Sequence, residues 1–303
     1  MTEERRGLAL GVMAYALWGA FPLYWPLLEP SGALEILAHR VVWSSITLAV
    51  LVVALRRGAA VRAIMADRRV RLLLLVAAVT ITTNWTTYIY GVNSGRVVET
   101  SLGYFINPLV TVLMGVLVLR ERLRPLQWVA LGVGVSAVLV LSVDYGRPPW
   151  LALVLAFSFG TYGLAKKSAD VGAVESLAFE TAVVAPVAIG YLVWLGAQGE
   201  SNFAAHGVGH ALLFTTAGVV TAVPLICFGA AATRVSLVSL GLLQYLAPVI
   251  QFALGLLVFH EDMTTGRWAG FLLVWAALTM FTVEAIRHHR RQLVLSVAAS
   301  TAA

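Results

Sequence analysis

Two charged side chains lie inside long apolar runs, where a permanent charge is costly. Arg40 stands near the start of one run, in the segment E-I-L-A-H-R-V-V-W-S, and Glu180 stands in a run of the second half. A charge at the centre of a bilayer costs roughly 2.5–3.5 kcal/mol on insertion scales, so such groups usually face a partner, water or a substrate. A guanidinium offers a planar fork of donors to a carboxylate. We therefore expect Arg40 and Glu180 to act in substrate binding or gating.

Two other interpretations of these charges stay open. Arg40 lies close to one end of its run, so its side chain could extend to the membrane surface. Either charge could instead belong to a structural ion pair, with Glu99 as a nearby acid for Arg40. The sequence alone does not separate these interpretations from a role in transport.

Three titratable groups are candidates for proton coupling. Glu35 and His39 are four residues apart, which places them on one face of a helix, and a histidine beside a carboxylate can titrate near neutral pH. Glu99 stands at the start of another apolar run, where an acid also stabilises a helix N-terminus. A histidine with its hydrogen bonds satisfied at a helix end, and a capping role for Glu99, are the structural alternatives.

Neutral polar and aromatic residues near the middle of the runs form a second candidate set. Pro108 and Pro248 each interrupt a run, and proline frees a backbone carbonyl that a substrate or a neighbouring helix can use. We expect the polar and aromatic residues around these positions to line a cavity for a flat or amphipathic solute, although each aromatic ring could also serve packing alone. The set comprises Asn84, Trp85, Tyr104, Asn107, Gln244 and Tyr245.

The apolar runs are the elements that must position these side chains. The chain is 60% hydrophobic and only 12% charged, about half the charged fraction of an ordinary soluble domain. A membrane-spanning helix needs roughly 20 mainly apolar residues. By that measure the sequence predicts an all-α membrane protein with ten spans, near 7–28, 34–55, 71–93, 97–119, 125–143, 149–165, 173–196, 211–232, 235–259 and 267–286.

Other functional classes find little support in the sequence. The net charge of +6 comes from basic residues in short connections, which determine membrane topology, so we expect no nucleic-acid partner. No hydrolase or nucleotide-binding motif is present, so we expect no catalytic residues, no cofactor and no enzyme activity. His206 and His210 have a metal-like spacing but no third ligand, so no metal site is expected. Cys227 is a lone cysteine and cannot form an internal disulfide.

A repeated block relates the two halves of the chain. Aligning Pro108 with Pro248 also aligns Gly115 with Gly255, Glu121 with Glu261, Trp128 with Trp268, and Arg40 with Glu180. Five spans per half is an odd number, so the second half enters the membrane from the opposite side, as in transporters with inverted repeats. We expect repeats at 1–143 and 144–291, a tail at 292–303, and a cavity lined by the third, fourth, eighth and ninth spans. The repeated glutamates suit a helix cap better than a coupling site.

The distribution of basic residues predicts the orientation. Most of the 21 Lys and Arg residues fall in connections on one side, including those of the 56–71 loop, while the other side holds only Arg96, Arg147 and Arg267. Cytoplasmic connections carry the excess of Lys and Arg. Both termini and the 56–71 loop are therefore expected in the cytoplasm, and the loop near 199–209 outside.

The sequence resembles a known transporter family over nearly its whole length. The five-plus-five layout, Trp18-Gly19 and the repeated Pro-x6-Gly-x5-Glu blocks are similar to the EamA-type drug/metabolite transporters. Within that superfamily, E-I-L-A-H-R-V-V-W-S, S-L-G-Y-F-I-N-P-L and A-F-S-F-G-T-Y-G-L resemble the RarD branch, named as chloramphenicol-sensitive proteins. Gly103-Tyr104 has no close partner in the second half, where Leu243-Gln244 stands instead.

The resemblance implies a secondary transporter of the bacterial inner membrane that exports a small organic metabolite or drug. Inverted repetition predicts alternating access as its mechanism. Its partners would be a small-molecule substrate and the lipid bilayer. A proton-coupled uptake carrier using Glu180 or His39, and a passive facilitator or scaffold, are the alternative functions.

Overall fold

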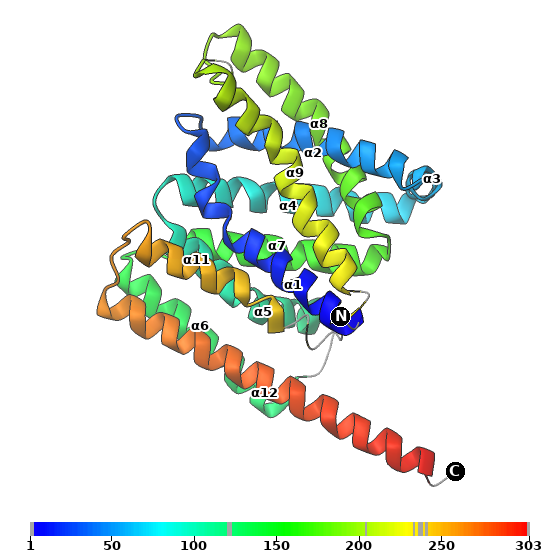
Figure 1. The fold of residues 1–303 in the computed structure, drawn as a ribbon. Coiled ribbons are helices and arrows are strands. Elements are labelled where there is room, and N and C mark those ends of the chain that lie inside the picture. The colour runs from blue at the N-terminus through cyan, green and yellow to red at the C-terminus, as the bar shows by residue number, and fades with distance from the viewer. Residues whose placement is uncertain are drawn as a thin grey trace.

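Helices account for all of the regular structure in the described part of the chain. The computed structural model describes residues 3–119, 123–203, 205–232, 234–235, 239 and 242–301, with side chains excluded at 115, 117–119, 232 and 288–301. Its ten longer helices, within those residues, are α1 (Glu3–Gly19), α2 (Ala33–Ala54), α4 (Arg68–Asn93), α5 (Val97–Leu119), α6 (Pro125–Asp144), α7 (Trp150–Ala169), α8 (Ala173–Ala197), α9 (Gly207–Ala232), α11 (Leu246–Leu257) and α12 (Thr265–Thr301). The expected all-α class is confirmed (Figure 1).

Eight of the helices found in the described residues are long and apolar enough to cross a membrane. They correspond to predicted spans one to five, seven, eight and ten. Helix α7 has 20 residues, but Lys166 and Lys167 in its last turn lower its apolar character. Helix α11 has 12 residues, because the described helix begins only after Tyr245. The chain is therefore a multi-pass membrane protein in which α7 departs from the predicted spans in apolar character and α11 departs from them in length.

The first predicted span, 7–28, is divided in the structure. Helix α1 ends at Gly19 and two short 3₁₀ helices follow, η1 (Phe21–Leu23) and η2 (Trp25–Leu28). Pro22 and Pro26 stand at the first turns of these helices, where a missing N–H is tolerated. The resulting bend places Phe21 and Trp25 in the protein interior rather than along a straight helix.

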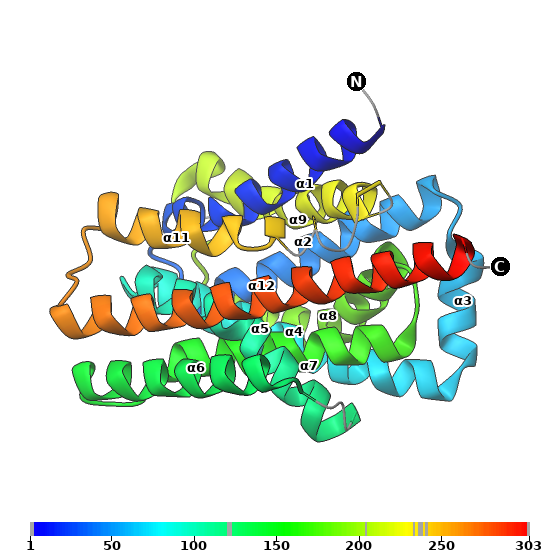
Figure 2. The ribbon, with the colours of Figure 1, turned by 90° about the horizontal axis from the view of Figure 1, so that it is seen from below.

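The connection at 56–71 contains a further short helix, α3 (Gly58–Ala66). The Asp67 carboxylate then caps α4 by accepting hydrogen bonds from Arg69 N at 2.8 Å and Val70 N at 3.1 Å. At the other end of the chain, α12 continues to Thr301, well past the span predicted at 267–286. The start of α1, helix α3 and the end of α12 lie toward the same end of the bundle (Figures 1 and 2).

Helices from the two halves of the chain pack against one another throughout the bundle. Helix α2 packs against α8 and α9, α4 against α7, α5 against α7 and α11, α1 against α9 and α11, and α6 against α12. Small residues allow close approach, which is how helices associate in membranes. A Cβ atom at Gly103 of α5 would lie 2.8 Å from Leu155 Cβ and 2.9 Å from Ala152 O of α7.

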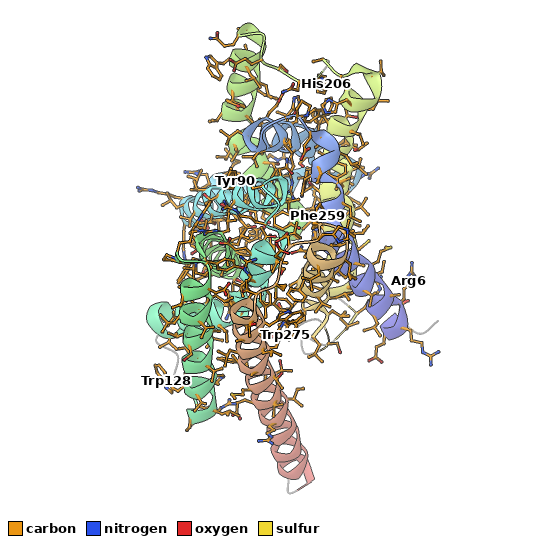
Figure 3. The ribbon with its side chains drawn as sticks, turned by 90° about the vertical axis from the view of Figure 1, so that its left-hand side faces the viewer. Arg6, Tyr90, Trp128, His206, Phe259 and Trp275 are labelled. Carbon is orange, nitrogen blue, oxygen red and sulfur yellow. The ribbon has the colours of Figure 1, made fainter. Side chains whose placement is uncertain are left out.

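Large apolar side chains cover much of the outer surface. Val143 is 83% exposed and Trp128 is 55% exposed, and Trp128 points away from the bundle in Figure 3. Such a surface is stable in contact with lipid rather than water. The exposed Trp128 near the start of α6 suits an interfacial anchor.

Candidate functional site

A cavity of about 320 Å³ lies among helices from both halves of the chain. Side chains of α4, α5, α9 and α11 line it, as predicted, and side chains of α1, α2 and α7 also contribute. The volume is at the lower end of the roughly 300–1,000 Å³ typical of small-molecule sites. Its walls are largely aromatic, with Tyr15, Trp18, Phe21, Trp85, Tyr88, Tyr104, Phe159, Tyr162 and Phe228 among the lining residues.

Arg40 of α2 lines this cavity and is only 4% exposed. Its Nε donates a hydrogen bond to Thr221 Oγ1 on α9 at 3.1 Å. Its guanidinium carbon lies 4.0 Å from the ring centroid of Trp85 and 4.9 Å from that of Trp25, which are cation–π distances. The side chain is therefore held in the interior and does not extend to the membrane surface.

No carboxylate pairs with Arg40 among the described residues. Glu99, the acid proposed from the sequence as its partner, is instead bound to Arg147. The structural ion pair between Arg40 and Glu99 is thus absent from the described structure.

Asn84 organises the polar part of the cavity wall. Its Nδ2 donates to Leu155 O at 3.0 Å and to Ser158 Oγ at 3.1 Å on α7. Its Oδ1 accepts a hydrogen bond from Tyr104 Oη at 3.2 Å. These bonds fix the orientation of both side chains before any ligand arrives and link α4, α5 and α7 on one side of the site.

Three cavity-lining side chains have a buried polar atom without a hydrogen-bond partner among the described residues: Tyr88 Oη, Asn107 Oδ1 and Gln251 Oε1. Gln251 Nε2 donates to Trp18 O at 3.1 Å, which leaves its oxygen to accept another hydrogen bond. Buried polar atoms without partners are costly, so a ligand that hydrogen-bonds to these atoms gains affinity from them.

Four other residues named from the sequence divide between the cavity and its surroundings. Trp85, Asn107 and Gln244 line the cavity together with Arg40 and Asn84. Tyr245, one residue beyond Gln244, packs against the core cluster that includes Val98, Phe105 and Phe252. Tyr245 is therefore a packing residue in this structure and does not line the cavity.

Glu180 is 1% exposed and lies outside the cavity lining. Lys166 Nζ of α7 donates a hydrogen bond to Glu180 Oε1 at 2.9 Å, and the two groups form an ion pair. Lys166 also donates a hydrogen bond to Ser176 Oγ. A small crevice containing Glu180 is separated from the cavity by Ile81 and Trp85, which line both spaces. The two charges aligned by the repeat therefore lie in different spaces, both of which Ile81 and Trp85 line.

His39 and Glu35 do not interact as a hydrogen-bonded pair in the described structure. The His39 ring stacks on Phe203 at 4.7 Å and lies 4.4 Å from Phe214. Glu35 accepts hydrogen bonds from Asn202 N at 2.7 Å and Asn202 Nδ2 at 3.0 Å. Glu35 thus fastens the start of α2 to the loop between α8 and α9.

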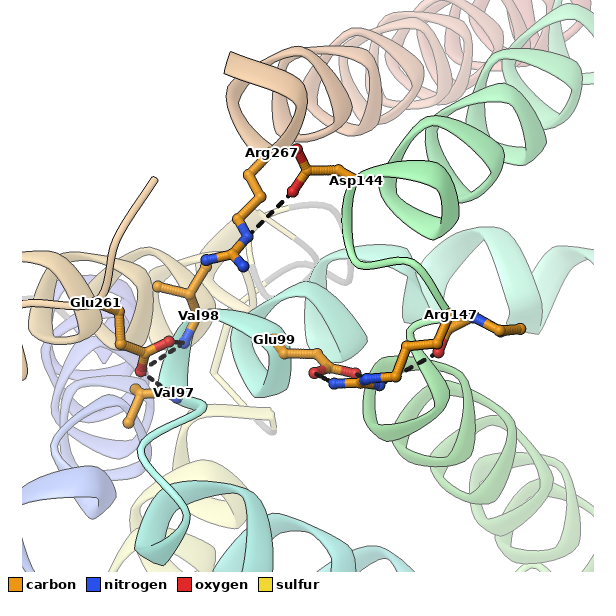
Figure 4. Close-up of polar contacts among 8 residues, drawn as sticks. Val97, Val98, Glu99, Asp144, Arg147, Glu261 and Arg267 are labelled. Atoms are coloured by element: carbon orange, nitrogen blue, oxygen red, sulfur yellow. Dashed lines mark hydrogen bonds and ion pairs between the residues drawn. The ribbon is translucent and has the colours of Figure 1, made fainter. Parts of the chain in front are cut away.

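Glu99 belongs to a cluster of charges (Figure 4). These residues come from or adjoin the start of α5, the end of α6 and the start of α12, which lie at the end of the bundle opposite α3 (Figure 2). We name Glu99, Asp144, Arg147, Glu261 and Arg267 the rim cluster. Arg147 Nη2 pairs with Glu99 Oε2 at 2.8 Å, and Arg267 Nε pairs with Asp144 Oδ2 at 3.2 Å. The hydrogen bond that Arg147 donates to Glu99 raises the pKa of the Arg147 guanidinium above its ordinary value, so Arg147 stays charged.

Glu261 caps the N-terminus of α5 from the loop before α12. It accepts hydrogen bonds from the backbone N–H groups of Val97 and Val98 (Figure 4). Burial raises the pKa of Glu261 from 4.5 to about 7, even though the two N–H donors favour its charged form. The geometry is that of the helix cap predicted for the repeated glutamates. Its repeat partner, Glu121, lies outside the described residues.

The sequence interpretation missed several lining residues: Tyr15, Phe159, Tyr162, Thr221, Phe228 and Gln251. A helical spacing was the available signal, because Phe159 and Tyr162 are three residues apart, as are Tyr15 and Trp18. The same spacing leads from a residue named in the sequence analysis to a missed one: Gln251 lies three residues after Pro248, and both line the cavity.

Comparison with known proteins decides the family. A model of the EamA-like transporter family matches residues 5–143. The chain is 60% identical to "Protein RarD" of Streptomyces exfoliatus, and the match covers 95% of this chain and 92% of that protein. The chain belongs to the EamA-like transporter family.

Further relatives place it within the same group of EamA-like proteins. It is 38% identical to "Protein RarD" of Escherichia coli strain K12, over 95% of this chain and 98% of that protein. It is 40% identical to the uncharacterized transporter YojE of Bacillus subtilis, over 95% of this chain and 97% of that one. A solved crystal structure with 18% sequence identity has the same fold, with a TM-score of 0.59, over 93% of this chain and 98% of the other.

Family membership agrees with the general chemistry of the site. This EamA-like protein is a membrane transporter of the RarD group and not an enzyme. A small-molecule substrate and a lipid bilayer follow from that class. An aromatic cavity with a few fixed polar groups is a site for binding, and it needs no reacting side chain.

Proposed function

We propose that this protein is a secondary transporter that exports a small organic metabolite or drug across the bacterial inner membrane by alternating access. The observation that carries the proposal is the cavity itself, which is bounded by helices of both halves of the chain. A site at the interface between two repeats can be exposed to either side when one repeat rocks against the other.

Inverted repeats, at 1–143 and 144–291, account for the helix packing. In chain order, α1, α2, α4, α5 and α6 of the first half correspond to α7, α8, α9, α11 and α12 of the second. Replacing each helix by its counterpart turns the α1–α9 contact into α4–α7, α1–α11 into α5–α7, and α2–α9 into α4–α8, and all of these contacts are present. The remaining major contacts, α2–α8, α5–α11 and α6–α12, each join a helix to its own counterpart. A pseudo-two-fold relation of this kind supports two similar conformations that differ by exchange of the roles of the halves.

The orientation that fits this proposal has both termini and α3 in the cytoplasm. Basic residues concentrate around α3, and the start of α1 and the end of α12 lie toward that end (Figure 2). Cysteine labelling tests it with Arg62→Cys and Glu200→Cys in a Cys227→Ser background. A membrane-impermeant maleimide added to intact cells should label the second variant and spare the first. Labelling of position 62 from outside would overturn the orientation.

A cysteine in the cavity tests alternating access directly. Leu225 lines the cavity and is partly buried, so Leu225→Cys in the same background reports access to the site. The proposal predicts that an impermeant maleimide reaches this position in right-side-out and in inverted vesicles, and that a bound ligand protects it from both sides. Reaction from one side only, in vesicles that react normally at the two loop positions, would argue against it.

A proton-coupled carrier is the alternative form of this function, and Glu180 is the best-supported site for the coupling proton. Glu35 is held by Asn202 and Glu99 is held by Arg147, so both have fixed structural partners. Glu180 is buried and pairs with Lys166, whose Nζ lies 5.4 Å from the ring of the cavity-lining Tyr162. If Glu180 carries the coupling proton, Glu180→Gln should abolish accumulation driven by a pH gradient while leaving exchange of substrate at equal pH. Unchanged accumulation would exclude Glu180.

A further inference from the structure

We infer that the substrate is an organic monoanion: a carboxylate that binds Arg40, attached to a flat and largely apolar body that lies among the aromatic rings. The inference rests on the proposed function and specifies the substrate class of the same cavity. It depends on the hydrogen-bonding capacity of Arg40, on the charge of the lining residues and on the shape of the walls.

Arg40 retains most of its hydrogen-bonding capacity. A guanidinium has five N–H donors, and the described structure uses one of them, from Nε to Thr221 Oγ1. The Trp85 ring at 4.0 Å supports one face of the guanidinium, which leaves the edge with the terminal nitrogens for a ligand. Two parallel N–H groups match the two oxygens of a carboxylate, and such bidentate pairs are among the strongest polar contacts.

The charge balance of the cavity favours a single negative charge. Arg40 is the one charged side chain among the described residues that line it. A cationic ligand would place like charges together in a space of low dielectric constant, which is strongly unfavourable. A dianionic phosphate ester would bring one more negative charge than Arg40 can balance, and an uncompensated buried charge is costly.

The remaining walls suit a flat body with one further polar group. Aromatic side chains surround the space, and rings stack favourably on rings. Gln251 Oε1 lacks a partner in the described residues and can accept a hydrogen bond from a hydroxyl or amino group of the ligand. The site therefore has a donor side at Arg40 and an acceptor at Gln251.

A series of ligands with one ring system and different head groups tests the inference. Purified protein in detergent is titrated with naphthylacetate, naphthylacetamide, naphthylmethylamine and naphthyl phosphate, and its thermal unfolding is followed. The carboxylate should raise the melting temperature most, because ligand binding to the folded state stabilises it. Equal or larger shifts with the amide, the amine or the phosphate would overturn the assignment, as would no shift with naphthylacetate at millimolar concentration.

Variants assign the effect to Arg40. Arg40→Gln should weaken naphthylacetate binding about tenfold or more and bring its affinity close to that of the amide. Arg40→Lys keeps the charge without the planar fork and should bind with intermediate affinity. Arg62→Gln, an exposed change of the same charge on α3, is the matched control and should bind like the wild type. Unchanged binding in Arg40→Gln would overturn the inference.

The comparison within the unaltered protein remains decisive if Arg40→Gln does not fold. A series in which the amide or amine binds best, together with two-sided access at position 225, would remove the anion assignment and leave the transport site intact. Failure of that access test would remove the proposed function itself.

Discussion

Arg40 and Glu180 occupy aligned positions in the two halves of the chain, yet their surroundings differ. Arg40 lies in a cavity, supported by aromatic rings, and has no acid beside it in the described structure. Glu180 lies in a narrow crevice and pairs with Lys166 at 2.9 Å. The difference shows that the two halves surround their aligned charges differently: Arg40 faces a cavity, and Glu180 is enclosed in an internal pair.

Breaking the enclosed pair should have the largest effect on stability. Lys166→Met leaves the Glu180 carboxylate buried without its partner, and the loss of one member of a buried pair costs roughly 3–5 kcal/mol. We expect a clear fall in melting temperature in detergent. The double variant Lys166→Met, Glu180→Leu removes both charges and should recover most of the loss; a double variant as unstable as the single one would mean that packing, and not the ion pair, is responsible.

The same kind of change at Arg40 should have a much smaller effect on stability. Arg40→Met removes a buried cation that has no acidic partner in the described structure, so no opposite charge is left behind. Loss of the cation–π contacts costs about 0.5–2 kcal/mol, and relief of the buried charge offsets part of that. Thermal unfolding of Arg40→Met and Lys166→Met side by side checks this. If Arg40→Met is the less stable of the two, Arg40 is chiefly a structural residue.

Trp85 should be the element that keeps the two environments apart. It stacks on Arg40 and also lines the crevice of Glu180. A double-mutant cycle of Trp85→Leu and Arg40→Gln on naphthylacetate affinity should give a coupling free energy of about 0.5–2 kcal/mol. Tyr90→Leu, at an exposed aromatic residue on the same helix, is the control and should show no coupling to Arg40. Strict additivity between Trp85 and Arg40 would show that the stacking does not position the guanidinium.

The sequence predicted the helical class, most of the spans and part of the cavity lining because these depend on local patterns. Arg40, Asn84 and Gln244 were found as polar residues inside apolar runs, and all three line the cavity. The partners were not predictable, since the pairings of Glu99 with Arg147 and Glu180 with Lys166 depend on how separate helices meet. The end of α1 at Gly19 and the orientation of Tyr245 depend on backbone geometry that apolar periodicity does not encode.

The rim cluster offers the smallest expected effect, a dependence of stability on pH. The folded pKa of Glu261, about 7, is above its ordinary value of 4.5, so the folded state binds the proton more tightly than the unfolded state. That contribution to stability is present below about pH 4.5 and is lost as the pH rises through 7. Glu261→Gln should flatten the fall in melting temperature over this range by on the order of 1 kcal/mol, allowing for partial exposure.

Neighbouring charges need a control in this pH experiment. Glu99, Asp144, Arg147 and Arg267 lie in the same cluster, so a matched variant at an exposed acid, Glu200→Gln, should leave the pH profile unchanged. An unaltered profile in Glu261→Gln would show that another group titrates in this range.

Counterflow in proteoliposomes tests the central claim most directly. Vesicles are loaded with the unlabelled compound that gives the largest thermal shift in the head-group series, then diluted into a trace of the same compound in labelled form. Protein-free liposomes measure the passive leak, and Arg62→Gln serves as the charge control. A carrier with alternating access should produce a transient internal excess of label in wild type and Arg62→Gln, and a strongly reduced one in Arg40→Gln. Simple equilibration without an excess, or equal excess in Arg40→Gln, would contradict the account.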